Sequence, residues 1–315
     1  MTETKLKILI IAALVVIDAA WIVLRGFSFD ATSLTMGIFV TIATAALGYF
    51  YRQYRSDMRL ATIATETSFL IAFSAAAAMF SYLITTLNLP LIDKTLIRTD
   101  ALLGFHWPQY VGYGFAHRWI NLPAAVLYQS TLFQIALAVV VLPALGHTDR
   151  SSELVSIVMV SALFCVVIAG ILPSAGALAY YHPGAAFFGH THTVVDLAYK
   201  QTFFDLRDGA LKRLSLRDVH GLVAFPSYHV ALCGVMVVAF RGMRRFFWPI
   251  LLLNTLVMLS TPLEGGHHLS DGLGGAALAF LSAAIVIPLR ARLRPSVAAQ
   301  VNRQEEFGEA AQQHA

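Results

Sequence analysis

Histidine is concentrated in one part of this sequence. Seven of the 11 histidines lie between residues 182 and 268, and the rest are scattered singly. An imidazole can move a proton near neutral pH or attack as a nucleophile. The clustered residues are His182, His190, His192, His220, His229, His267 and His268. Because ionisable groups among apolar segments are costly, this region is the first place to look for chemistry.

The segment Gly265–Asp271 contains a possible nucleophile and its orienting group. His267 and Asp271 are four residues apart, which places them on one face of a helix. Asp271 could then accept the Nδ1–H of His267 and leave Nε2 free. Gly265 and Gly266 let a ligand approach the backbone closely. The alternative is an ordinary helix start with an acidic residue near the dipole and two interfacial histidines.

The stretch Pro226–His229 predicts a helix start that could bind an anion. Pro226 suits the first turn of a helix, where its missing N–H costs nothing. The N–H groups of Ser227, Tyr228 and His229 would then be free to bind phosphate, with the Ser227 hydroxyl as a further donor. His229 could deliver a proton. The alternative is a proline-capped span whose histidine faces lipid headgroups.

A third stretch offers two cations. Lys200 and Arg207 are seven residues apart, about two helical turns, so they would share a helix face and could clamp a phosphate. A solvated amphipathic helix is the alternative. Taken together, the three stretches supply a nucleophile, an acid, N–H donors and cations, which is the inventory that phosphoryl transfer needs.

Composition determines the setting of this chemistry. Of 315 residues, 57% are hydrophobic and only 13% are charged, about half the usual globular share. This excludes a disordered chain and an ordinary soluble enzyme. The net charge of +4 does not indicate nucleic acid binding, because the basic residues form short clusters between apolar runs. Cys165 and Cys233 lie inside apolar runs, so no disulfide framework or zinc site is expected.

The apolar runs predict an all-α integral membrane protein with about eight transmembrane helices, since a span needs about 20 apolar residues. The first run resembles a signal peptide but lacks a small-residue cleavage site, so we expect it to remain as a helix. The sixth and seventh runs are short, so their ends could extend into Arg241–Arg245 or into the flanking loops. The expected spans are Ile8–Leu24, Thr32–Tyr51, Leu60–Leu87, Trp119–Leu145, Leu154–Tyr180, Pro226–Phe240, Phe246–Ser260 and His268–Leu289.

Lys and Arg clusters predict the orientation. With eight spans, four clusters fall on one side, and the positive-inside rule makes that side cytoplasmic. They are Lys5 and Lys7; Arg52, Arg55 and Arg59; Arg241, Arg244 and Arg245; and Arg290, Arg292 and Arg294. Both termini would then be cytoplasmic. The segments 88–118, 181–224 and 261–267, and with them the histidine-rich region, would face the outer (periplasmic, extracellular or lumenal) side.

Together, the three stretches resemble the motifs of the type-2 phosphatidic acid phosphatase superfamily of membrane lipid phosphatases and phosphotransferases. Pro226-Ser227-Tyr228-His229 is a full match to its Pro-Ser-x-His motif. In the motif Ser-Arg-x5-His-x3-Asp the histidine and aspartate match, but Thr261 replaces the arginine. In the motif Lys-x6-Arg-Pro, Lys200 and Arg207 match, but Asp208 replaces the proline.

With these departures from the superfamily motifs, the sequence resembles the branch related to inositol phosphorylceramide synthase. That branch has Phe-Pro-Ser-x-His, Gly-Gly-His-x3-Asp and Leu-Arg-x-Gly, and Leu206-Arg207-Asp208-Gly209 fits the last. Asp93, Asp100, Leu103-Gly104-Phe105 and Trp107 also resemble its segment after an early span. The resemblance implies residues 1–59 as two additional helices, 60–291 as a six-helix phosphatase/phosphotransferase core and 292–315 as a polar cytoplasmic tail.

The resemblance also implies roles for the site residues. His267 would be the nucleophile that forms a phosphohistidine, Asp271 would orient it, and His229 would protonate the leaving oxygen. The phosphate would be bound by Lys200, Arg207, Ser227 and Tyr228. No metal or other cofactor is implied. His268 or Arg217 could replace the missing arginine, and His182, His190 and His192 could be interfacial, line the site or bind a metal.

The sequence therefore predicts a membrane lipid phosphatase or phosphotransferase, sphingolipid-like in its branch, acting on a phospholipid or other lipid phosphate within the bilayer. It does not choose between water and a hydroxyl lipid or polyol as acceptor, nor does it name the headgroup or the oligomeric state. The alternatives are a lipid or solute transporter without enzymatic activity, whose histidines relay protons or bind cargo, and a catalytically inactive family member.

Overall fold

The computed structural model describes residues 2–183, 193–195, 197–217 and 219–293. Seven helices in these ranges are long and apolar enough to cross a membrane, which confirms an all-α integral membrane protein. They are α1 (Glu3–Arg25), α2 (Thr32–Gln53), α3 (Met58–Thr85), α6 (Arg118–Ala144), α7 (Thr148–Ile171), α12 (Arg244–Glu264) and α13 (Leu269–Leu293). An eighth apolar helix, α11 (Tyr228–Ala239), has only 12 residues.

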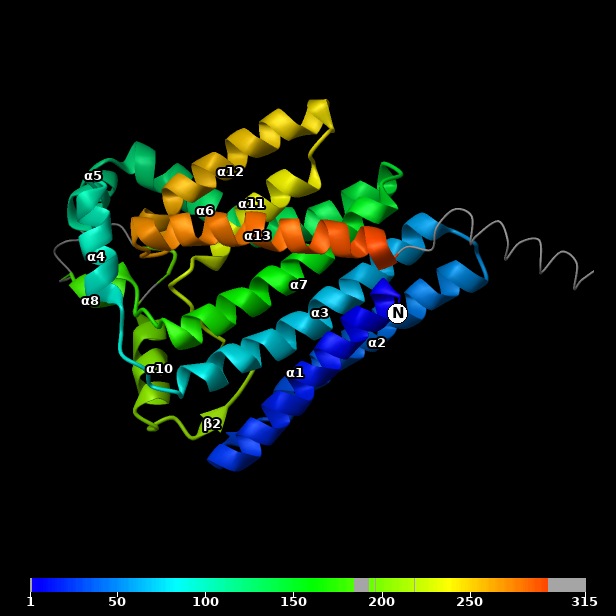
Figure 1. Ribbon diagram of the computed structural model, residues 1–315, viewed down its shortest axis with the longest axis horizontal. Helices are drawn as coiled ribbons and strands as arrows, with labels where there is room; N and C mark the ends of the chain where they lie inside the picture. The colour runs from blue at the N-terminus through cyan, green and yellow to red at the C-terminus, as the bar shows by residue number, and fades with distance from the viewer. Residues whose placement is uncertain (1, 184–192, 196, 218, 294–315) are drawn as a thin grey trace, which may run out of the picture.

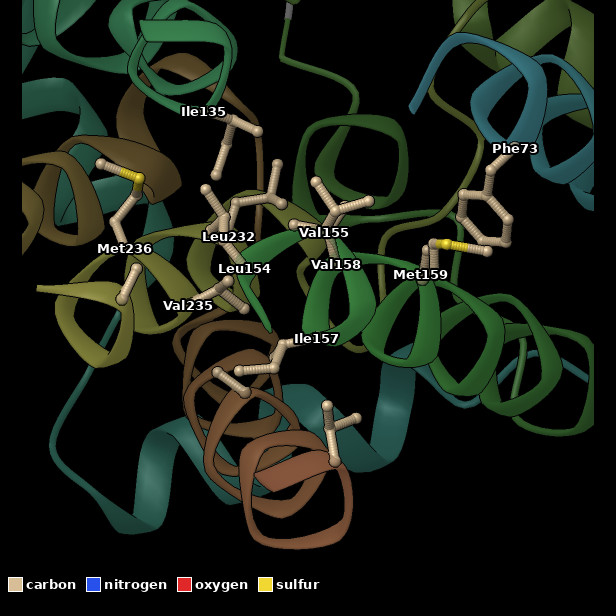
Figure 2. Close-up of a cluster of buried hydrophobic side chains, with 14 of the residues drawn as sticks. Phe73, Ile135, Leu154, Val155, Ile157, Val158, Met159, Leu232, Val235 and Met236 are labelled. Carbon is tan, nitrogen blue, oxygen red and sulfur yellow. The ribbon is translucent and has the colours of Figure 1, made fainter. Parts of the chain in front are cut away.

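Helix α7 is the centre of the bundle. Figure 2 shows its Leu154 and Met159 among side chains from the surrounding helices, including Phe73 of α3, Ile135 of α6 and Leu232 of α11. All five are almost fully buried. Lipid tails are as apolar as these side chains, so burial alone does not favour helix association in a membrane. Close van der Waals packing around α7 therefore contributes to the association of these helices.

Helices α11 and α13 approach each other through small residues. A Cβ at Gly275 would lie 2.2 Å from the backbone oxygen of Ser227, and a Cβ at Gly234 would lie 2.6 Å from the Cβ of Ala279. Small residues permit such contact between membrane helices. The contact fixes the first turn of α11 against the first turns of α13.

Substitution of Gly275 by alanine is expected to lower the free energy of unfolding by about 1–3 kcal/mol, because the clash is with backbone that cannot rotate away. Gly272→Ala on the same helix is the matched control, since its Cβ would meet only Val230 at 3.8 Å. The melting temperatures of both variants in detergent check this. Equal melting temperatures would show that the two helices can separate without cost.

Within the described residues, four short helices gather at one end of the bundle (Figure 1). They are α4 (Asp93–Leu102), α5 (Trp107–Ala116), α8 (Ala177–Tyr181) and α10 (Ala198–Arg207). The same end carries a two-stranded parallel pairing of β1 (Ser28–Phe29) with β2 (Arg213–Leu214). This pairing was not expected, and it ties the α1–α2 connection to the segment that leads into α11. We call this the α4/α10 end.

Ion pairs join the helices at the opposite end of α13. Lys7 Nζ lies 2.7 Å from Glu66 Oε2, and Arg290 Nε lies 2.9 Å from Glu3 Oε1. Glu153 of α7 also pairs with Arg241. The basic residues that follow α11 and end α13 are thus at the same end as the start of α1. We call this the basic end.

Two expected helix boundaries were wrong, and a third lies further out, as expected for a short run. The fifth span ends at Ile171 rather than at Tyr180, because Pro173 follows and Gly176 has φ 84°, which a continuing helix cannot adopt. The seventh extends from Arg244 to Glu264, well beyond Phe246–Ser260. Pro226 is not in the first turn of α11, since Ser227 is the N-cap and the helix begins at Tyr228.

Candidate active site

The junction of α12 and α13 presents His267 at the α4/α10 end. Asp271 lies in the first turn of α13, and its Oδ2 is 3.2 Å from His267 Nδ1. The same oxygen accepts the backbone N–H of His268 at 2.8 Å. A carboxylate at Nδ1 places the ring proton there and leaves Nε2 as the free acceptor. The expected i, i+4 pairing is therefore present in the structure.

The start of α11 lies against this pair. The backbone N–H of Ser227 donates to the backbone oxygen of Asp271 at 2.9 Å, so it is not free for an anion. The Ser227 hydroxyl is buried and lies 3.5 Å from His267 Nε2. The next two N–H groups, of Tyr228 and His229, belong to the first turn of α11, where a helix has no internal partners for them.

His267 and His229 line one cavity of about 510 Å³. Its wall comes from α6, α10, the extended segment before α11 and the α12–α13 junction. The His229 ring stacks on Tyr128 of α6, with centroids 4.2 Å apart and planes 10° from parallel. The polar side chains of the described wall are those of Tyr128, Gln129, Tyr199, His220, His229 and His267.

A buried cluster of two carboxylates and one imidazole supports the junction. His268 is 1% exposed, with Nε2 3.6 Å from Asp93 and Nδ1 3.5 Å from Asp100. Asp100 also accepts the backbone N–H groups of Leu269 and Ser270 and the Ser270 hydroxyl. Asp93 accepts the Ser174 hydroxyl and the N–H groups of Ala175 and Gly176. Helix α4 thereby anchors both the His267 segment and the turn after α7.

The charges in this cluster stabilise one another. Burial opposes a charge on His268, but the carboxylates of Asp100 and Asp93, with Asp271 nearby, raise its pKa to about 9. Burial also opposes the charges of Asp93 and Asp100, yet the adjacent His268 ring and the hydrogen bonds from the neighbouring donors hold both pKa values below the usual one. The cluster is therefore a cation between two anions at neutral pH.

This cluster predicts a loss of stability at alkaline pH. An unfolded histidine titrates near pH 6.5, so the contribution of His268 is complete below that pH and disappears as the pH rises to about 9. The loss amounts to roughly 3 kcal/mol. Melting in detergent from pH 6 to 10 checks this, and the melting temperature of His268→Gln should fall less steeply over this range. Parallel curves for the two proteins would contradict the assignment.

The structure does not bring the two predicted cations to the cavity. Lys200 and Arg207 are both on α10, but only Tyr199 of that helix lines the cavity wall among the described residues. Lys200 Nζ lies 3.3 Å from His182 Nδ1. Arg207 donates to the backbone oxygen of Leu89 at 2.7 Å and lies over the Phe203 ring. Helical spacing placed the cations correctly on one helix, but it could not tell which way that helix faces.

Other predicted residues also point elsewhere. The hydroxyl of Tyr228 donates to the backbone oxygen of Val158 in α7. Thr261, in the position of the family arginine, is buried and donates to the backbone oxygen of Val257. The two replacement candidates are engaged as well: His268 by the cluster above, and Arg217 by Thr32. His190 and His192 lie outside the described residues.

Sequence reasoning missed Tyr128, Tyr199 and His220 as residues of the cavity wall. Tyr128 lies within an apolar span, where an aromatic residue is common, and Tyr199 directly precedes Lys200 in a stretch whose motif residues are the two cations. His220 belongs to the histidine cluster, which was a usable signal. Its backbone N–H donates to the Tyr82 hydroxyl of α3 at 2.7 Å, which fixes the extended segment against the bundle.

Comparison with known proteins gives a match to one family model. No curated protein and no solved structure matches the chain significantly. A family model described as "PAP2 superfamily" matches residues 94–285, which is more than half of the chain. The match begins inside α4 and ends inside α13, so it contains His229, His267 and Asp271 but not α1, α2 or α3. The chain therefore belongs to the PAP2 superfamily.

Proposed function

We propose that this protein is a membrane lipid phosphatase or phosphotransferase that works through a phosphohistidine at His267. Members of the PAP2 superfamily are phosphatases or phosphotransferases, which gives the general class. The main observation in support is that His229 of α11 and His267 of the α12–α13 junction line one cavity, while Asp271 contacts Nδ1 of His267 and leaves Nε2 free. That is the arrangement of a nucleophile, its orienting group and a separate acid.

The reaction follows from these positions. His267 Nε2 attacks phosphorus while the bond from phosphorus to the leaving oxygen breaks, and His229 as an imidazolium gives its proton to that oxygen. His229 then takes a proton from the acceptor hydroxyl, and the acceptor oxygen displaces His267 from phosphorus. The Ser227 hydroxyl beside Nε2 and the N–H groups at the start of α11 would bind the phosphoryl oxygens.

The cavity favours transfer from a lipid phosphodiester, as in the branch related to inositol phosphorylceramide synthase. None of the described wall residues is a lysine or an arginine, and Thr261 replaces the family arginine. A phosphodiester carries one negative charge and a phosphate monoester carries up to two near neutral pH, so the diester needs less compensation. The acceptor would then be a hydroxyl lipid or polyol, and water would be a slower acceptor.

The site would face the outer side of the membrane in an eight-span chain. Helix α11 starts beside His267 and ends near Arg241, which pairs with Glu153 at the basic end, so α11 and the segment before it together connect the two ends. Its 12 residues span only about 18 Å, and the extended segment 221–227 supplies the remaining length. Irregular backbone at membrane depth is tolerated where it lines a cavity, as residues 221–224 do here. The basic end would be cytoplasmic.

The test is to trap the phosphorylated protein. Membranes containing the full chain are incubated with a phospholipid that carries radioactive phosphate, either as a monoester or as a diester, and are quenched in alkali. We expect label that survives alkali and is released by acid, because a phosphoramidate has those stabilities. The His147→Ala protein should label normally and His267→Ala should not. A chain that turns over lipid without labelling, or does neither, would contradict the proposal.

A further inference from the structure

The three helices that precede the family match form a second cavity. It has a volume of about 470 Å³ and lies between α1, α2 and α3, with Phe29 and Leu216 also in its wall. Its other walls are mostly aliphatic, with Ile22, Ile38 and Met79 among them. Except for Leu216, none of the lining residues falls within residues 94–285, so the cavity is separate from the site shared by the family.

One carboxylate faces this apolar space. Asp18 of α1 lines the cavity and is only 5% exposed, and its Oδ1 has no hydrogen-bond partner among the described residues. The two other polar side chains of the wall do not supply one. The Ser33 hydroxyl donates to the backbone oxygen of Asp30 instead. Thr41 contacts Ser68 of α3, but there its backbone oxygen is the acceptor and its hydroxyl is not involved. A carboxylate left without a partner in such a place is expensive.

The position of Asp18 within α1 argues for a bound partner. It is seven residues from Arg25, the last residue of the helix, which is about 10 Å along the axis. The side chain is too short to reach water by extending past the helix end, as a lysine or arginine could. The described chain places no cation against it: the ion pairs of α1 involve Glu3 and Lys7 near its first turn.

The size of the cavity limits what could fill it. A helix about 10 Å in diameter would fill this volume with only about one turn, so a partner helix cannot account for it. A volume of this size is in the range of small-molecule sites. Apolar walls suit an alkyl chain, and an unpaired carboxylate suits a positively charged head.

We propose that this cavity binds a single-chain cationic amphiphile, with its alkyl chain between α1, α2 and α3 and its ammonium group on Asp18. The ligand class is a long-chain primary amine. The site is independent of the proposed phosphoryl chemistry, because it shares no residue with the cavity of His229 and His267.

The test uses a photoactivatable octadecylamine with the full-length protein in detergent. Photolabelling should fall on peptides of α1, α2 and α3, and Asp18→Asn should reduce it roughly 10-fold or more, which is the range for losing a charge-assisted hydrogen bond. Photoactivatable octadecanol and octadecanoic acid of the same length serve as neutral and anionic probes. Both should label the wild-type cavity weakly.

A second variant tests the cavity without touching the charge. Gly37 lines the wall and a Cβ there would meet nothing within 4 Å, so Gly37→Leu should fold and fill the space. We expect it to abolish amine labelling, while Thr35→Leu on the exposed side of α2 should not. The proposal is overturned if Asp18→Asn labels as strongly as wild type, if the alcohol or the acid labels as well as the amine, or if Gly37→Leu leaves labelling unchanged.

Discussion

Replacement of His267 by alanine is expected to lower lipid-phosphate turnover roughly 10⁴-fold or more, since the variant has no nucleophile at the position that Asp271 orients. The fold should persist. The ring is 7% exposed at the edge of a cavity and does not fill a core, and the loss of one hydrogen bond to Asp271 should cost about 1 kcal/mol. Turnover in purified membranes and melting in detergent, measured on the same preparation, check both statements.

Two further variants make this prediction specific. Asp271→Asn keeps the side chain's shape but weakens the orientation of the ring, so we expect an intermediate loss of roughly 10²-fold or more in turnover with little change in KM. His147→Ala removes a histidine near the basic end and should leave turnover unchanged. Substantial activity in His267→Ala would remove the nucleophile assignment, whatever the other variants show.

Replacement of Asp100 by alanine is expected to have the largest effect on stability. It leaves the positive charge of His268 with Asp93 as its remaining close partner and takes the acceptor from Leu269, Ser270 and the Ser270 hydroxyl. Removal of one partner from a buried ion pair costs about 3–5 kcal/mol. Turnover should fall as well, because these bonds hold the segment that carries His267. Thermal melting and kcat at pH 7 are the two measurements.

The control for Asp100 is Asp57, whose side chain contacts only the start of its own helix among the described residues. Asp57 caps α3 through the N–H groups of Arg59 and Leu60, and its loss should cost about 1 kcal/mol without changing kcat. If Asp100→Ala lowered stability by no more than Asp57→Ala, helix α4 would not be the anchor of the active-site junction.

The spacing of residues along the sequence predicted the contact between His267 and Asp271. His267 and Asp271 are one helical turn apart, so the geometry of a single helix start determines their contact. Long apolar runs likewise predicted most of the spans. The end of α12 depends instead on distant contacts: the helix continues to the buried Glu264, whose carboxylate accepts hydrogen bonds from Asn121 and from the backbone of Val194.

The supporting contacts could not be predicted from spacing. His268 lies 168 residues beyond Asp100, and no periodicity connects them. The sequence indicates Asp93 and Asp100 only through the family resemblance, which gives them no role. Similarly, the spacing of Lys200 and Arg207 determines that they share a helix face but not which cavity that face meets. Only tertiary packing determines the direction in which a short helix at the end of a bundle points.

The ion pairs at the basic end have a practical consequence for purification. Glu3 and Lys7 hold Arg290 and Glu66, whose side chains are 6% and 8% exposed. An affinity tag that displaced the start of α1 would take Lys7 from Glu66 and leave Arg290 with the more distant Glu153, 3.8 Å away, with a cost of several kcal/mol. Tags should therefore be attached after α13, and yield losses from tags placed before Thr2 would reflect misfolding rather than poor insertion.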